Sequence, residues 1–175
     1  WIQTLRDRVG EFNPHIVVEP KAKIMVLGTG FLGMQYVDFF NQNGYEAVGV
    51  NREHVDITDA AQTKNVIENF APQIVINAVA LTDIDWCEHN RAQAIAVNTI
   101  GADNVAAACE QNGIYLVHIS SGCIQESLNR DMVHTEDDPV SPVCFYAWTK
   151  VFAEQMIADR ASRGRRPPAR AGAPP

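Results

Sequence analysis

KIMVLGTGFLG, residues 23–33, is the stretch that decides the fold of this 175-residue chain. Its first five residues form a short apolar run, which is typical of a buried strand. Glycines follow at positions 28, 30 and 33, and residues 31–43 then carry apolar side chains at helical spacing. We therefore predict a strand, a tight glycine turn and a helix in direct succession.

The glycine turn has the spacing of a loop that binds a dinucleotide. In such loops the first glycine permits the turn, the second lets the backbone approach a pyrophosphate, and the third lets the helix pack on the strand. The helix N-terminus adds partial positive charge. We predict that Gly28, Gly30 and Gly33 bind NADP or NAD, together with Phe31 and Leu32 between them; a purely structural turn is the alternative.

Strands and helices continue to alternate along the chain. Further strands are predicted over residues 45–50, 73–77 and 115–119, with a short extended piece at 55–57. Helices are predicted over residues 59–70 (with Asp59 as the cap), 90–112 and 145–160. Strands that are rich in Val and Ile at every position indicate a parallel sheet covered on both faces. The predicted fold class is α/β, a Rossmann-type doubly wound parallel sheet.

Charge divides the chain into a body and a tail. The net charge is −7, but all 21 acidic residues precede position 160, whereas five arginines lie between positions 160 and 170. An acidic body argues against a nucleic-acid partner or an anionic membrane surface. We expect a lead-in segment over 1–21, an NAD(P)-binding domain over 22–160 and a disordered Arg/Pro/Ala tail over 161–175.

Other compositional features are those of a cytoplasmic enzyme. No apolar stretch approaches the roughly 20 residues that span a bilayer, and the start does not resemble a signal peptide. The four cysteines form no CxxC pair, and the histidines lack metal-ligand spacing, so we predict reduced thiols and no metal site. His118 lies inside a predicted strand, and we interpret it as a core or hydrogen-bonded histidine rather than a catalyst.

The end of the second strand bears on which cofactor is bound. NAD enzymes usually place an acidic side chain there to bind the ribose hydroxyls, but this chain has Asn51 and Arg52. Arg52 can pair with a 2′-phosphate, which favours NADP, whereas the neighbouring Glu53 leaves NAD as an alternative. Asp56 can hydrogen-bond the adenine amine, although a capping or turn role is comparable.

A tyrosine and a lysine form the candidate catalytic pair. Tyr146 and Lys150 stand four residues apart in a predicted helix, so they project from the same face. A nearby cation lowers the pKa of a phenol, which would make the tyrosine a usable acid or base. Ser121 follows a buried strand at the carboxyl edge of the sheet, where open α/β folds bind ligands.

The ordered set of motifs resembles the extended short-chain dehydrogenase/reductases. The set consists of residues 28–33, DIT at 56–58, INAVA at 76–80, VN at 97–98, Ser121, and Tyr146 with Lys150. Within that superfamily, three further stretches resemble nucleotide-sugar 4-keto reductases: LTDIDWCE at 81–88, SGCI at 121–124 and FYAWTK at 145–150. The most similar families are the dTDP-4-dehydrorhamnose reductases and the epimerase/reductase module of plant-type rhamnose synthases. The resemblance covers about residues 22–160.

This resemblance implies NADPH-dependent reduction of the C4 ketone of a 4-keto-6-deoxy nucleotide-sugar of the dTDP or UDP type. By it, Tyr146 protonates the carbonyl oxygen, Lys150 holds the ribose, Ser121 hydrogen-bonds the carbonyl and Asn98 supports a proton relay. It also implies a set of cofactor contacts: Gly28, Gly30, Phe31, Leu32, Gly33, Asn51, Arg52, Asp56, Ile57, Asn77, Ala78, Ala80 and Lys150. The implied substrate contacts are Thr82, Asp83, Ser121 and Cys123.

Cys123 raises a second activity. Its Ser-x-Cys arrangement resembles that of 3,5-epimerase/reductases, in which the cysteine handles a proton next to the ketone. A packing role for this cysteine is the alternative. The resemblance also implies a homodimer formed through helices that include the Tyr146 helix.

The chain departs from the family in three ways. Its glycine loop is one residue shorter than the usual GxxGxxG, and Gln125 and Glu126 replace the aromatic and small residues usual there. The Arg/Pro tail begins within a dozen residues of Lys150, so we expect the C-terminal strands and the substrate region that follow the tyrosine helix in the family to be missing here. A non-catalytic NAD(P)-binding or regulatory module of the same fold is therefore the alternative function, and a methyltransferase is a weaker one.

Overall fold

A computed structural model describes residues 21–125, 134–135 and 138–164. The predicted lead-in segment, except for its last residue, and most of the predicted tail lie outside these residues. The described part contains a four-stranded parallel sheet in the order β2-β1-β3-β4. The strands are β1 (Lys23–Leu27), β2 (Glu46–Val50), β3 (Ile74–Asn77) and β4 (Tyr115–His118).

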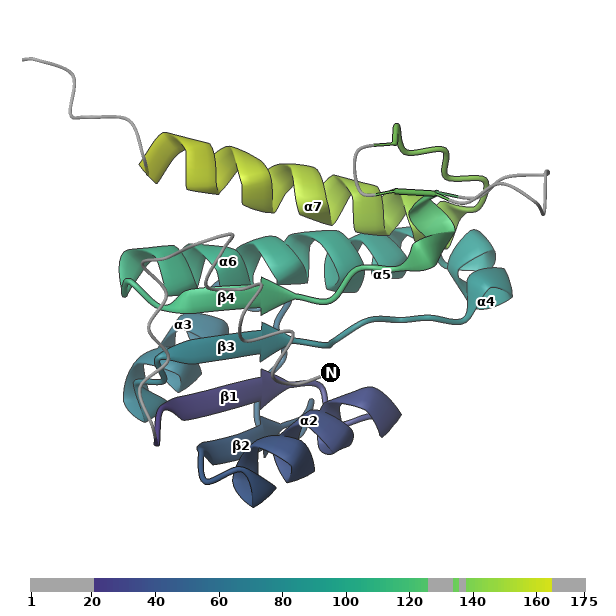
Figure 1. Ribbon diagram of the computed structural model, residues 1–175. Coiled ribbons are helices and arrows are strands. Elements are labelled where there is room, and N and C mark those ends of the chain that lie inside the picture. The colour runs from purple at the N-terminus through teal and green to yellow at the C-terminus, as the bar shows by residue number, and fades with distance from the viewer. Residues whose placement is uncertain (1–20, 126–133, 136–137, 165–175) are drawn as a thin grey trace, which may run out of the picture.

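The predicted Rossmann-type sheet is confirmed, with helices on both faces (Figure 1). The helices are α2 (Phe31–Gln42), α3 (Ala60–Phe70), α4 (Ile84–His89), α5 (Arg91–Ile95), α6 (Ala102–Gln111) and α7 (Phe145–Gly164). A π-helix, Ala96–Gly101, joins α5 to α6, and a 3-10 turn, Gly122–Ile124, follows β4. Among the described residues no helix has the length and apolar character needed to cross a membrane.

Two apolar clusters hold the layers together. On one face, Val37 of α2 packs with Ile24, Val26 and Ile76 of the sheet. On the other face, the alternate strand residues pack against α3 and α6, with Ile67 and Val105 fully buried. Since successive strand side chains point to opposite faces, a parallel strand buried on both faces must be apolar where it is buried, as residues 24–27 of β1 are. Helix α7 lies beside α6 beyond the β4 edge of the sheet (Figure 1).

The register aligns the carboxyl ends of all four strands. Leu27 pairs with Val50 on one side and with Asn77 on the other, and Asn77 pairs with His118. The loops that follow these strands therefore leave the sheet at one edge. In open α/β sheets this edge binds the ligand.

The expected extended piece at residues 55–57 is wrong, because no described strand covers it. Asp56 instead accepts hydrogen bonds from the backbone N–H and the hydroxyl of Thr58, at 3.0 and 2.7 Å, so the chain turns. Val55 and Ile57 are nevertheless buried in the core. Their apolar alternation reflects burial from a loop rather than pairing in a sheet.

The helices also differ from the prediction in three places. The predicted helix over 90–112 is divided into α5, the π-helix and α6, and α4 was not predicted at all. Asp83 begins α4 by accepting a hydrogen bond from the N–H of Trp86, at 2.9 Å. Helix α7 continues to Gly164, four residues past the predicted end. The predicted cap of α3 is confirmed, since the Asp59 carboxylate accepts from two N–H groups of the first turn.

Candidate functional site

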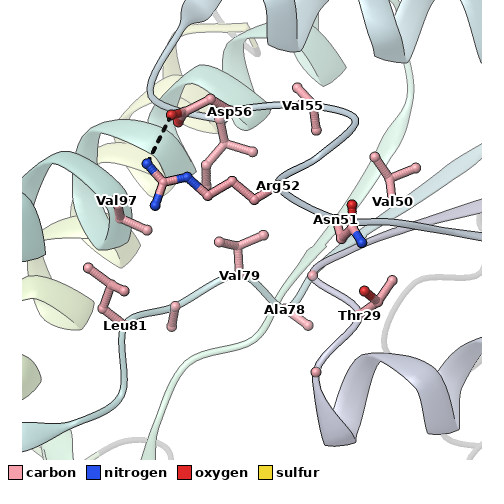
Figure 2. Close-up of a pocket in the computed structure, with 14 residues that line it drawn as sticks. Thr29, Val50, Asn51, Arg52, Val55, Asp56, Ala78, Val79, Leu81 and Val97 are labelled. Atoms are coloured by element: carbon pink, nitrogen blue, oxygen red, sulfur yellow. Dashed lines mark ion pairs between the residues drawn. The ribbon is translucent and has the colours of Figure 1, made fainter.

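A pocket of about 340 Å³ lies at the carboxyl ends of β1, β2 and β3 (Figure 2). Eight of the predicted cofactor residues line it: Gly28, Gly30, Asn51, Arg52, Asp56, Ile57, Ala78 and Ala80. The structure adds lining residues that were not predicted as cofactor contacts: Thr29, Val50, Val55, Val79, Leu81 and Val97. Most of these are apolar residues that stand next to predicted contacts in the sequence. That adjacency is the signal by which they could have been identified.

The fold requires two of the three glycines in the loop, and the third faces open space. Gly28 has a φ of +90°, which strains a residue with a side chain, and a Cβ there would lie 2.9 Å from Val79 N. A Cβ at Gly33 would lie 1.8 Å from the carbonyl oxygen of Gly28, so helix α2 packs on the turn only with glycine. A Cβ at Gly30 would meet no atom within 4 Å, because it points into open space.

The start of helix α2 suits an anion. Gly30 is the N-cap residue and provides no side-chain hydrogen bond, and the first turn holds no acidic residue. Free N–H groups at a helix N-terminus attract negative charge. Phe31 and Leu32 expose their side chains and do not line the pocket, so only their backbone N–H groups can serve a phosphate. The open space at Gly30 and this N-terminus together fit a dinucleotide pyrophosphate.

Arg52 and Asp56 form an ion pair at the mouth of the pocket, with 3.6 Å between Nη2 and Oδ2 (Figure 2). Hydrogen bonds from Thr58, followed by the Arg52 charge, hold the pKa of Asp56 below its usual value. The Asp56 side chain thus has the turn role that we considered beside adenine binding. The Arg52 side chain is 85% exposed, so its guanidinium is accessible to a phosphate.

The loop after β3 forms the pocket floor. Ala78 N donates to Leu27 O at 2.9 Å, which binds this loop to the end of β1. Asn77 is fully buried and does not line the pocket; its Oδ1 accepts from Val79 N at 3.1 Å. Its Nδ2 has no hydrogen-bond partner among the described residues. Asn77 therefore shapes the loop from beneath.

The predicted catalytic residues gather at the β4 side of the same sheet edge. Tyr146 and Lys150 on α7 are both buried, with 7% and 1% of their surfaces exposed. Ser121 begins the 3-10 turn, where its Oγ accepts a hydrogen bond from Cys123 N at 3.2 Å. Burial raises the pKa of Tyr146, and a hydrogen bond with the Ser121 hydroxyl partly opposes this. The expected lowering of that pKa by Lys150 is not found.

Lys150 is held against the end of β4. Its Nζ donates to the carbonyl oxygen of Ile119 at 2.7 Å and lies 3.3 Å from Nε2 of His118. Burial lowers the pKa of Lys150 to about 8, with the charge of Glu154 opposing the shift. The interpretation of His118 as a hydrogen-bonded core residue agrees with this contact.

Asn98 occupies the π-helix and is fully buried. Its amide accepts from Leu81 N at 2.7 Å, and it donates to Leu81 O and to Thr149 Oγ1, both at 3.0 Å. Thr149 in turn donates to Tyr146 O at 2.6 Å. The Asn98 side chain therefore joins the pocket loop to the Tyr146 helix. A π-turn often marks a functional position, and here it aims this amide at two segments.

Three cysteines pack in the cluster that contains the tyrosine, and two predicted substrate residues, Thr82 and Asp83, directly precede α4. Cys87, Cys123 and Cys144 belong to the apolar cluster that contains Tyr146. Asp83 is occupied as the cap of α4, while Thr82 is exposed. Within the described ranges no group of three or more His, Cys, Asp or Glu side chains is placed to hold a metal ion.

The chain is similar in sequence to proteins of one known family. Residues 22–164 match the RmlD substrate-binding domain family. A dTDP-4-dehydrorhamnose reductase of Mycolicibacterium smegmatis is 31% identical over 136 residues, which cover 77% of this chain and 41% of that protein. The spore coat polysaccharide biosynthesis protein SpsK of Bacillus subtilis is 30% identical over 136 residues, covering 77% of this chain and 48% of that protein.

Solved structures share the fold. The dTDP-4-dehydrorhamnose reductase of Bacillus anthracis, in complex with NADP, superposes with a TM-score of 0.76 at 28% identity, covering 82% of this chain and 51% of that one. The Thermus thermophilus UDP-glucose 4-epimerase complexed with NAD also gives 0.76, at 23% identity, covering 81% of this chain and 51% of that one. The chain spans about half the length of these relatives. By the family match over residues 22–164, this chain belongs to the RmlD substrate-binding domain family.

Proposed function

We propose that this chain is the cofactor-binding and proton-donating part of a nucleotide-sugar 4-keto reductase that uses NADPH. One observation carries the proposal: a buried Tyr146 bonded to Ser121 shares a sheet edge with a dinucleotide pocket built on a glycine turn. The relatives named as dTDP-4-dehydrorhamnose reductases support this substrate class. The exposed Arg52 at the pocket mouth supports a cofactor with a 2′-phosphate.

When bound, NADPH supplies the hydride that reduces the C4 ketone. Tyr146 donates the proton to the carbonyl oxygen. Its raised pKa keeps the phenol protonated at neutral pH but makes it a weaker acid, so the transfer needs a positive charge that stabilises the phenolate. The Ser121 hydroxyl hydrogen-bonds the phenol and is placed to orient the carbonyl. Lys150, one helical turn away, contacts the end of β4 in this structure; we propose that its remaining N–H reaches the phenol oxygen when the cofactor is bound and supplies positive charge where a phenolate develops.

The pH dependence of the reaction follows from Lys150. Its pKa of about 8 keeps most of the ammonium charged at pH 7. Raising the pH through 8 removes this charge, and with it the stabilisation of the phenolate. We expect the reaction rate to fall as the pH rises. The fall should begin about two pH units below the pH at which an ordinary lysine loses its proton.

The test measures NADPH binding first and turnover second. Purified chain is titrated with NADPH by calorimetry, and NADPH oxidation with a dTDP-4-keto-6-deoxy sugar is then followed at 340 nm. Because the relatives are about twice as long, the same assay is run on a fusion of this chain to the second half of the Bacillus anthracis reductase. Turnover by the fusion supports the reductase, and no turnover by either protein contradicts it.

Tyr146→Phe is the decisive variant. It should bind NADPH normally and lower turnover of the fusion by about 100-fold or more, since only the proton donor is lost. Tyr115→Phe is the matched control, because Tyr115 is 46% exposed at the start of β4. NADPH binding without turnover in every protein would favour the alternative, a non-catalytic NAD(P)-binding module.

Cys123 carries the proposed 3,5-epimerase step. It lies partly buried in the same cluster as Tyr146, so a thiol is near the proton donor. Deuterium uptake at C3 and C5 of the sugar from D₂O measures the epimerisation. Cys123→Ser should abolish the uptake, whereas Cys109→Ser, in the core between sheet and helix, should leave it unchanged. Parallel assays with the UDP sugar decide the nucleotide.

A homodimer through α7 is proposed on one further observation. Trp148, Phe152 and Met156 follow one another at four-residue spacing on this helix and are 38 to 42% exposed. An apolar stripe of this kind suits a second copy. Sedimentation should give a dimer for the chain and a monomer for Phe152→Glu.

A further inference from the structure

We propose that His118 is a positioning residue: its imidazole and the carbonyl of Ile119 form a seat that fixes the Lys150 ammonium beside the Tyr146 site. The proposal rests on the proposed function only for the use that is made of Lys150. The seat itself is a feature of the fold, since it joins α7 to the carboxyl end of β4.

The contacts define the seat. The lysine Nζ lies 2.7 Å from Ile119 O and 3.3 Å from His118 Nε2, two acceptors contributed by successive residues of one strand end. His118 pairs in register with Asn77, in the row where all four strands end. Lys150 itself is 1% exposed. A buried ammonium needs such partners, because a charge without them is expensive to bury.

The chemistry of the two groups fixes the histidine tautomer. An ammonium has three N–H donors and no acceptor, so Nε2 must be the acceptor and Nδ1 must carry the proton. Nδ1 is buried and has no hydrogen-bond partner among the described residues. The seat thus retains an unsatisfied donor on the histidine in order to hold the lysine.

The seat leaves the lysine partly available. Among the described residues, two acceptors lie within hydrogen-bonding distance of Nζ, and the third N–H remains for a ribose hydroxyl or the phenol oxygen. Without His118 the ammonium would have one acceptor on the protein and more rotational freedom. The imidazole therefore serves to direct the remaining donor.

The charges around the pair are consistent with a neutral imidazole. Burial, followed by the Lys150 charge, lowers the pKa of His118 to about 4. On α7, Glu154 is the charged group that acts on Lys150, and its carboxylate favours the ammonium. Tyr146 lies one turn before Lys150 on the same helix, and Asp159 and Arg160 lie further along it. At neutral pH the seat is thus an acceptor, and protonating it would put two cations 3.3 Å apart.

Two variants separate positioning from packing. His118→Leu removes the acceptor at similar volume, whereas His118→Gln places an amide oxygen near the position of Nε2. His89→Leu is the control, because His89 is exposed on α4. NADPH affinity is measured from pH 6 to 10 for each protein.

We expect His118→Leu to weaken NADPH binding about tenfold at pH 7. Its loss of binding at alkaline pH should shift down by about one pH unit, because an ammonium that loses an acceptor has a lower pKa. His118→Gln should stay within about threefold of the parent at all pH values, and the control should match the parent. A folded His118→Leu protein with an unchanged pH profile would overturn the proposal.

Nitrogen-15 NMR of the parent protein supplies a readout that needs no cofactor. The expected spectrum shows the His118 ring protonated on Nδ1 at pH 7, with Nε2 accepting. A ring protonated on Nε2 would overturn the proposal even if every variant failed to fold. If the parent binds no NADPH, the proposed function fails, and the NMR result alone decides the seat.

Discussion

The dinucleotide pocket and the Tyr146 site share one sheet edge but are built differently. The pocket is open, and the groups that it offers to a cofactor are the backbone of a glycine turn and the exposed Arg52. The Tyr146 site is closed, and buried polar side chains such as Asn98 and Lys150 are held there by partners far away in sequence. One region depends on the absence of side chains and the other on their hydrogen bonds.

This difference determines how each region should respond to substitution. In the pocket, the effect of a substitution depends on the direction in which the added atom points. In the Tyr146 site, the outcome depends on which polar group loses its partner, since a buried unsatisfied group costs roughly 1 to 3 kcal/mol. The predictions below use matched changes to test this contrast, beginning with the largest expected effect.

Gly33→Ala should destabilise the fold most. Its Cβ would lie 1.8 Å from the Gly28 carbonyl oxygen, so α2 must move away from β1, at a cost of about 3 kcal/mol or more. Gly30→Ala adds the same atom into open space and should change the unfolding free energy by less than about 0.5 kcal/mol while weakening NADPH binding. Urea unfolding and calorimetric titration measure the two effects. Equal stabilities for both variants would remove the directional argument.

Asn98→Ala tests the closed region. It leaves the N–H of Leu81 without its partner and removes one donor each from Leu81 O and Thr149 Oγ1, so we expect a loss of about 2 to 4 kcal/mol. Thr149→Val removes a single member of the same group and should cost about 1 kcal/mol. Chemical unfolding of both proteins gives the comparison. If Asn98→Ala lowers the free energy of unfolding by less than Thr149→Val does, the Asn98 amide contributes little to stability.

Acid should weaken the closed region through His118. Its folded pKa of about 4 lies below the value of about 6.5 in an unfolded chain, so the unfolded state binds more protons between these values. The stability contributed by the neutral imidazole is complete above pH 6.5 and falls as the pH drops toward 4. Between pH 8 and 5 this loss is about 2 kcal/mol. The free energy of unfolding, measured at pH 8 and at pH 5, should fall by this amount in the parent but not in His118→Gln.

Arg52→Ala should have the smallest effect on the fold. Its side chain is 85% exposed and its one ion pair lies at the surface, so unfolding should be nearly unchanged. NADPH should bind about tenfold more weakly, while NADH should bind as before, because only NADPH carries the 2′-phosphate. Titrations with both cofactors measure this. An equal loss for both would assign Arg52 to a contact that the two cofactors share.

Sequence patterns predicted the open region better than the closed one. Glycine spacing and apolar runs are local signals, and they correctly placed β1, the turn and α2, as well as most residues that line the pocket. They failed at residues 55–57, where burial from a loop imitates a strand. They also missed the π-helix, because its side chains keep the apolar spacing of an ordinary helix.

In the closed region the sequence identified residues but not their partners. Tyr146, Lys150 and Ser121 were recognised from spacing and order, and the structure gathers them at one edge. The predicted direction of the Tyr146 pKa shift was wrong. Four-residue spacing suggests a cation beside the phenol but carries no information about burial. Lys150 is directed instead toward β4.

The sequence by itself thus determined the alternation of strands and helices, the glycine turn and the choice of candidate catalytic side chains, because these depend on local backbone preference, periodicity and spacing. The tertiary structure alone decided that Asn98 binds Leu81 and Thr149, and that Lys150 rests on His118 and Ile119. Those contacts join residues 17 to 51 positions apart. Such partners are selected by the packing of α7 beside the sheet edge, which no local pattern encodes.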